Sequence, residues 1–260
     1  MTPLPASDIP PVRGFSPEAP PPGIVLRGVR LTYDGTALFD SLDLDLPAGL
    51  CTCLLGASGC GKSSLLRLIA GLLPTAAGSV AGSDGEPLSG RVAFMAQQDL
   101  LLPWLSALEN AVLGARLRGQ APPVARAAEL LGSFGLGDRL RARPAALSGG
   151  MRQRVALART LVEERPVVLM DEPFSALDAI TRFRMQTLAA AALRGRTVLL
   201  VTHDPLEALR LGDRVLVLGG RPARVVASLA PPGPPPRDAT DAPLLHLQGE
   251  LLERLAAESP

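Results

Sequence analysis

The stretch GASGCGKSS at residues 56–64 constrains the fold of this chain more than any other feature of its sequence. The apolar run LCTCLLG leads into it, and SSLLRLIAGLL follows with leucines at helical spacing. Glycines let the backbone curl so that its N–H groups converge on an anion at the positive end of the next helix. Strand, glycine loop and helix in this order predict a phosphate-binding loop in an α/β domain.

The loop also carries the side chains that a bound polyphosphate needs. Lys62 would place a compact charge against the β and γ phosphates, and the Ser63 hydroxyl would ligate Mg²⁺. Lys62 is the only lysine of the chain, and because a planar guanidinium is too wide for a closed nest of amides, we infer a steric reason for keeping it. A glycine-rich turn without a ligand would need neither side chain. The residues expected to bind nucleotide here are Gly56, Ala57, Ser58, Gly59, Cys60, Gly61, Lys62, Ser63 and Ser64.

Two adjacent carboxylates, Asp171 and Glu172, end the apolar run VVLMDE. The carboxyl ends of parallel strands are where ligands bind in open α/β sheets. We therefore expect Asp171 to support Mg²⁺ and Glu172 to act as the base for an attacking water. The alternative is a solvated strand end, which the phosphate loop upstream disfavours.

Bulk properties limit the class of protein further. A chain of 260 residues is long enough for one substantial α/β domain, and a net charge of +1 gives no reason to expect a nucleic-acid partner. Cys51, Cys53 and Cys60 are too few and too clustered for a disulfide framework, which favours a reducing cytoplasm. We find no apolar run of the ~18 to 20 residues that a membrane-spanning helix requires.

The chain alternates strand and helix patterns around a helix-rich middle section. Proline-rich blocks occur at both ends, with eight prolines in the first 22 residues and PPGPPPR at 231–237. After the second block, leucines recur on one face of a short terminal helix. We expect a disordered leader at 1–22, the main domain at 23–230 with a helical subdomain at about 97–164, a linker at 231–242 and a helix at 243–258.

The segment LSGGMRQR at 147–154 resembles the signature of ATP-binding cassette (ABC) ATPases, and it precedes the acidic strand as that family requires. Small-molecule kinases and helicases can share the phosphate loop but not this segment. The resemblance covers about residues 24–228. It implies a P-loop NTPase core with a parallel sheet, an N-terminal antiparallel β subdomain, an inserted helical subdomain, and ATP hydrolysis with Mg²⁺.

The same resemblance implies roles for further residues. Tyr33 in LTYDG matches the aromatic residue that stacks on adenine, although a lone tyrosine often only packs. Gln97 in FMAQQDLLLPW matches the glutamine that links Mg²⁺ and water to the helical subdomain. Asp178 ends the SALD segment known as the D-loop, and His203 in VTHD matches the histidine that reaches the γ-phosphate. The expected catalytic residues are Lys62, Gln97, Glu172 and His203, and the expected metal-site residues are Ser63, Gln97 and Asp171.

The signature has chemistry of its own. Ser148, Gly149 and Gly150 open a helix, so their N–H groups and the helix dipole can form a second anion site. In this family that site lies far from the phosphate loop of its own chain. The resemblance therefore implies a head-to-tail dimer of two copies with two ATP molecules sandwiched between them.

The segment QDLLLPW resembles the ATPases of nitrate, taurine, sulfonate and hydroxymethylpyrimidine (thiamine-precursor) importers, with MAQQDLLLPW most like the last group. This predicts the motor subunit of a bacterial-type importer of a small polar solute. Its partners would be transmembrane permease subunits and, indirectly, a periplasmic or lipoprotein solute-binding protein. It would be peripheral, through the permease, on the cytoplasmic face of the cell membrane.

Two other classes are weighed against the importer. A soluble cassette ATPase of chromosome maintenance needs long coiled-coil insertions, and one of translation usually has two cassettes per chain. This sequence has neither feature. An exporter motor is disfavoured by the Leu-Leu-Pro-Trp segment. The transported substrate is not encoded in this chain, because the motor subunit does not touch it.

Overall fold

The computed structural model describes residues 19–33 and 35–258, so the first 18 residues of the expected leader lie outside the described part. The chain forms two compact units. The helical unit consists of Met95–Glu164 and Pro173–Arg194. The sheet unit contains the described residues of the remaining segments. The helical unit includes the residues of the expected helical subdomain at about 97–164 and, in addition, the segment Pro173–Arg194.

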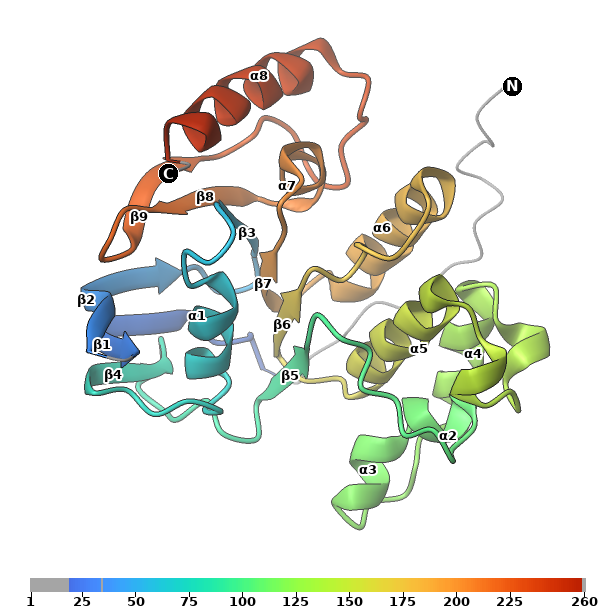
Figure 1. The fold of residues 1–260 in the computed structure, drawn as a ribbon. Helices are drawn as coiled ribbons and strands as arrows, with labels where there is room; N and C mark the ends of the chain where they lie inside the picture. Colours follow the sequence, from blue (N-terminus) through green and yellow to red (C-terminus); the bar gives the residue numbers. More distant parts are fainter. Residues whose placement is uncertain (1–18, 34, 259–260) are drawn as a thin grey trace. The chain divides into compact units, whose positions relative to one another are not determined.

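The sheet unit is built on a six-stranded sheet with the order β5-β6-β7-β3-β8-β9 (Figure 1). Strand β3 pairs in parallel with β7 and β8, and β6 pairs in parallel with β7, whereas β9 is antiparallel to β8. Every residue of β6 and β7 is buried, which explains their almost wholly apolar sequences. The bounds are β3 Cys51–Gly56, β5 Val92–Met95, β6 Val167–Asp171, β7 Thr197–Val201, β8 Arg214–Gly219 and β9 Arg224–Leu229.

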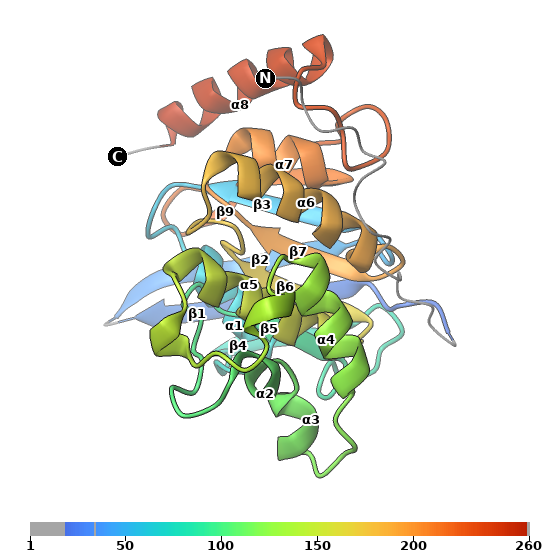
Figure 2. The ribbon, with the colours of Figure 1, turned by 90° about the vertical axis from the view of Figure 1, so that its right-hand side faces the viewer.

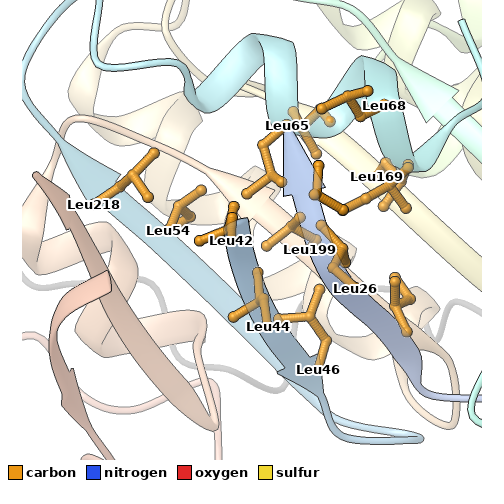
Figure 3. Packing of buried hydrophobic residues seen from close by; sticks show 14 of the residues in the cluster. Leu26, Leu42, Leu44, Leu46, Leu54, Leu65, Leu68, Leu169, Leu199 and Leu218 are labelled. Atoms are coloured by element: carbon orange, nitrogen blue, oxygen red, sulfur yellow. The ribbon is translucent and has the colours of Figure 1, made fainter. Parts of the chain in front are cut away.

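A separate antiparallel sheet contains the N-terminal strands in the order β2-β1-β4. Its inward-facing leucines pack with leucines of the six-stranded sheet and of helix α1 in one buried cluster (Figure 3). The α/β core, the antiparallel β subdomain and the helical insertion confirm the predicted fold class, except that the main sheet has one antiparallel edge strand. The bounds are β1 Ile24–Tyr33, β2 Thr36–Leu46, β4 Ala77–Gly82 and α1 Lys62–Ile69.

Two further helices of the sheet unit, α7 (Pro205–Leu211) and α8 (Ala242–Ala257), pack against each other (Figure 1). Leu244 and Leu251 of α8 are fully buried. The proline-rich segment before α8 is held by Arg237, which is itself buried. The Arg237 guanidinium donates hydrogen bonds to the carbonyls of Leu209, Gly212, Pro231 and Pro232.

The helical unit is centred on α5 (Gly149–Val162), which contacts both α2 (Ala107–Ala111) and α4 (Val124–Ser133) (Figure 2). Helix α6 (Ala179–Leu193) belongs to the same unit. The pattern at 106–119 predicts one helical segment, but the structure breaks it after α2 into a second short helix, α3 (Leu113–Leu117). Gly114 lowers helix propensity just after the break. None of the described helices combines the length and apolar character needed to cross a membrane.

Candidate active site

The glycine loop joins the end of β3 to the start of α1, as the sequence predicts. Only glycine fits at two of its positions. A Cβ on Gly56 would lie 2.5 Å from the carbonyl oxygen of Leu218, and Gly61 has φ 102°, in the left-handed region. The backbone is therefore bent tightly at both ends of the loop, and α1 presents its N-terminus to the loop.

Lys62 is almost completely buried and folds back over the loop. Its Nζ donates to the carbonyl oxygen of Gly56 at 2.7 Å and to that of Ala57 at 2.8 Å. The ammonium is therefore fixed at the centre of the loop, where a phosphate oxygen bound to the loop N–H groups would also meet it. An arginine could not place its wider planar group between these two carbonyls.

Asp171 ends β6, is buried, and accepts a hydrogen bond from the Ser63 hydroxyl. Burial raises the pKa of the Asp171 carboxyl; the hydrogen bond from Ser63 opposes this rise, and the nearby charge of Glu172 adds to it. Within residues 19–33 and 35–258 no cluster of three or more His, Cys, Asp or Glu side chains could by itself hold a metal ion. The hydroxyl and carboxyl oxygens of Ser63 and Asp171 are nevertheless the type of ligand that Mg²⁺ uses together with substrate phosphates. The donor set fits a nucleotide-bound Mg²⁺.

Glu172 follows directly, and its side chain lies against His203. The distance from Oε2 of Glu172 to Nδ1 of His203 is 2.7 Å, a hydrogen bond whose donor depends on the histidine tautomer. The two residues meet because β6 and β7 are neighbouring parallel strands and each residue follows the carboxyl end of its strand. Glu172 has φ 51°, an uncommon conformation for a residue with a side chain, and its N–H donates to Val201 O at 2.9 Å. The carboxylate is thus held in a defined position.

Tyr33 is the last residue of β1 in the same unit, and its side chain is 45% exposed. The exposed ring can stack on a planar ligand, as expected for a residue that contacts adenine. Tyr33, the phosphate loop, Asp171, Glu172 and His203 all belong to the sheet unit.

The helical unit contains the remaining candidates. Ser148 caps α5, with its Oγ accepting from the N–H of Met151 at 3.3 Å, and Gly149 begins the helix. Asp178 caps α6 by accepting from the N–H of Thr181 at 3.0 Å. Hydrogen bonds from the backbone N–H and from the side chain of Thr181 lower the pKa of the Asp178 carboxyl. Gln97 lies exposed two residues after β5. The structure places Gln97, Ser148, Gly149, Gly150 and Asp178 in this unit, whereas the phosphate loop belongs to the sheet unit.

One residue of this unit was not singled out in the sequence. Gln153 on α5 is buried and binds the D-loop by both ends of its amide, since its Nε2 donates to Ser175 Oγ and its Oε1 accepts from Ala176 N. These hydrogen bonds therefore join the signature helix α5 to the D-loop. Gln153 lies three residues after Gly150, so both residues face the same side of α5. This spacing could have indicated the contact, but the partners of Gln153 in the D-loop lie more than 20 residues away in the sequence.

The fold and these side chains define a P-loop nucleoside triphosphatase. The profile of the ABC transporter family matches residues 39–175, and the chain belongs to this family as one of its ATPases. This confirms the resemblance carried by the signature.

Relatives and solved structures agree with this membership. The chain is 40% identical to aliphatic sulfonates import ATP-binding protein SsuB 1 of Mesorhizobium japonicum, over 97% of this chain and 99% of the relative. It is 44% identical to SsuB of Rhodopseudomonas palustris (strain BisA53), over 89% and 83% of the two chains, and 42% identical to an uncharacterized ABC transporter ATP-binding protein of Haemophilus influenzae, over 90% and 98%. A dimeric ATP-binding cassette in a post-hydrolysis state with ADP and Pi superimposes with a TM-score of 0.71 and 30% identity, covering 81% of this chain and 99% of that one.

Proposed function

We propose that this chain is the ATP-hydrolysing subunit of an ABC importer for a sulfonate-type anion. The observation that carries the proposal is the grouping of Lys62, Asp171, Glu172 and His203 in one unit of a chain that matches import subunits over nearly its whole length. The grouping supports hydrolysis, and the similarity to sulfonate import proteins supports import.

In the proposed reaction, the loop N–H groups and Lys62 bind the β and γ phosphates of ATP, and Tyr33 stacks on the adenine. Ser63 and Asp171 would hold Mg²⁺, with Gln97 as a further ligand, and the bound ion would neutralise charge on the phosphates. The Glu172 carboxylate accepts a proton from the attacking water. The contact of 2.7 Å with His203 would orient that carboxylate. We propose that His203 also reaches the γ-phosphate, as the family resemblance implies.

The second anion site requires a second copy of the chain. Ser148, Gly149 and Gly150 supply helix N–H groups at α5, and the bonds of Gln153 tie this helix to the D-loop that ends at Asp178. We propose that these residues close over the nucleotide bound to the phosphate loop of a partner copy. Solved relatives described as dimeric cassettes support this arrangement.

The surface proposed to meet the membrane subunit is the loop at 99–105, which we call the docking loop. Leu100 and Trp104 are 59% and 64% exposed there, close together in one loop. A short cytoplasmic helix of a permease, with an apolar face, would cover both side chains. The chain would then be peripheral on the cytoplasmic face of the inner membrane and would meet a solute-binding protein only through the permease.

The proposed cargo follows from the relatives, not from the site. Those of M. japonicum and R. palustris are named as aliphatic sulfonates import proteins, so we favour a sulfonate over nitrate or the hydroxymethylpyrimidine class. The test is reconstitution of the chain with its membrane subunits and binding protein in liposomes. We expect ATP-dependent uptake of a short alkanesulfonate, competed by other sulfonates. Uptake of a pyrimidine but no sulfonate contradicts the cargo, and co-purification with DNA or ribosomes instead of a membrane subunit contradicts the import function.

A further inference from the structure

The docking loop exposes apolar side chains although its backbone is tightly fixed. Asn110 of α2 is completely buried, and its amide bonds four backbone groups at the end of the loop. Its Oδ1 accepts from Leu102 N at 2.8 Å, and its Nδ2 donates to the carbonyls of Leu102, Leu105 and Ser106 at 3.0–3.2 Å. Because polar bonds fix the turn, Trp104 does not have to be buried to order the loop.

The first half of the docking loop is fixed by α5. Nη2 of Arg159 donates to Asp99 O at 2.6 Å, and Nη1 donates to Leu100 O at 3.0 Å. Leu100 has φ 45°, a left-handed conformation that is unfavourable for leucine. The two bonds from one planar guanidinium therefore stabilise a backbone that would otherwise relax, and they keep the Leu100 side chain pointing outward.

A second arginine of the same helix holds the same segment. Nε of Arg152 lies 2.9 Å from Oδ2 of Asp99, and Nη1 of Arg152 donates to Leu147 O at 3.1 Å. Arg152 therefore bridges the residue that precedes Ser148 to the first residue of the docking loop. The second carboxylate oxygen of Asp99 accepts a hydrogen bond from Leu101 N at 3.2 Å. The position of the loop backbone therefore depends on the ion pair between Asp99 and Arg152.

Helix α5 thus connects the proposed anion site to the docking loop. Its N-terminus carries the anion site at Ser148, and Arg159 lies eleven residues further, roughly 16 Å along a straight helix. We propose that Arg152 and Arg159 are positioning residues that carry movement of the Ser148 end to the docking loop, so that the orientation of Leu100 and Trp104 depends on the nucleotide state. This inference rests on the proposed function, since it gives a route by which ATP binding would reach the permease.

The experiment uses Trp104 itself as the probe, because it is the only tryptophan of the chain. In a Glu172→Gln background, which traps ATP, the emission and acrylamide quenching of Trp104 are measured with and without ATP and Mg²⁺, alongside dimerisation on a sizing column. We expect an ATP-dependent change in the Glu172→Gln chain. Adding Arg159→Met should abolish this change, while ATP binding and dimerisation remain. Arg159→Lys keeps the charge but cannot span both carbonyls, and it should lose most of the change.

Two further variants keep the test decisive. Arg139→Met is the matched control, because Arg139 lies in the same unit and pairs with Asp138 rather than with the docking loop; it should keep the full change. Asp99→Asn retains an oxygen for Leu101 N but removes the charge facing Arg152, and it should weaken the change even if Arg159→Met fails to fold. A full ATP-dependent change in Arg159→Lys and Asp99→Asn overturns the inference, as does a Glu172→Gln dimer without any change. A chain that never dimerises with ATP contradicts the proposed function first, and the inference with it.

Discussion

Nδ1 of His203 lies 2.7 Å from Oε2 of Glu172, although the two residues are 31 positions apart in the sequence. They meet because each follows the carboxyl end of one of two neighbouring parallel strands. Glu172 also has a left-handed backbone, with φ 51°. A constrained carboxylate held by an imidazole beside a phosphate loop is suited to accept a proton from water at one defined point.

Replacing Glu172 with glutamine should leave ATP binding intact and slow hydrolysis by about two orders of magnitude or more, the usual loss for a general base. The uncharged amide keeps the shape of the side chain and its contact with His203, so the chain should fold normally. Phosphate release and equilibrium binding of ATP measure the two effects. The variant should accumulate as an ATP-bound dimer on a sizing column. Normal turnover would place the base elsewhere, with His203 and Asp178 the next candidates.

Lys62→Arg should abolish hydrolysis although the positive charge is retained. Nζ of Lys62 lies between the carbonyls of Gly56 and Ala57, and a guanidinium is too wide for that space. ATPase activity and ATP affinity are measured for this variant, with Arg67→Lys on the exposed side of α1 as the control that should stay active. Near-parental turnover of Lys62→Arg would remove the steric explanation for the lone lysine.

Asp171→Asn should increase thermal stability while abolishing hydrolysis. Burial raises the pKa of Asp171 in the folded chain, so the charged form costs stability at neutral pH. For an acid with a raised folded pKa, that cost appears as pH rises above the unfolded value of about 3.9 and is complete above the folded pKa. The melting temperature of Asp171→Asn should thus exceed the parent's at pH 7, and the difference should shrink on acidification. An unchanged difference across pH would show that the charge is not the cause.

Trp104→Ala should weaken assembly with the membrane subunit by roughly tenfold or more, as loss of an aromatic anchor does at many interfaces. Since Trp104 is 64% exposed, the same change should alter the free energy of unfolding by no more than about 0.5 kcal/mol. Denaturant unfolding and pull-down with detergent-solubilised permease separate the two effects. Trp104→Phe is the control that should retain assembly. A large loss of stability with normal assembly would make Trp104 a packing residue.

Local patterns were enough to predict which strands and helices carry several of the candidate residues. Three features could be located because a characteristic residue type stands next to a recognisable strand or helix. They are the glycine loop at Gly56 to Ser64, the acidic end of β6 and Ser148 at the start of α5. The edge strand β9 and the break between α2 and α3 were not predicted, because tertiary pairing and packing decide both. The bonds from Arg159 to the docking loop span 59 and 60 residues and end on backbone carbonyls, which leave no residue pattern to find. The bonds of Asn110 span only four to eight residues, but they too end on backbone groups and leave no residue pattern.

The most direct test of the account is a mixing experiment on the shared site. Ser148→Arg should bind ATP normally as an isolated chain, because Tyr33 and the phosphate loop belong to the other unit, yet it should not hydrolyse ATP. Lys62→Ala should be inactive through loss of phosphate binding. A mixed dimer contains one site damaged on both sides and one intact on both sides, so some ATPase activity should return after mixing if one intact site suffices. A Ser148→Arg chain that cannot bind ATP by itself would show that the signature contacts nucleotide within its own chain, and this result contradicts a nucleotide site shared between two copies.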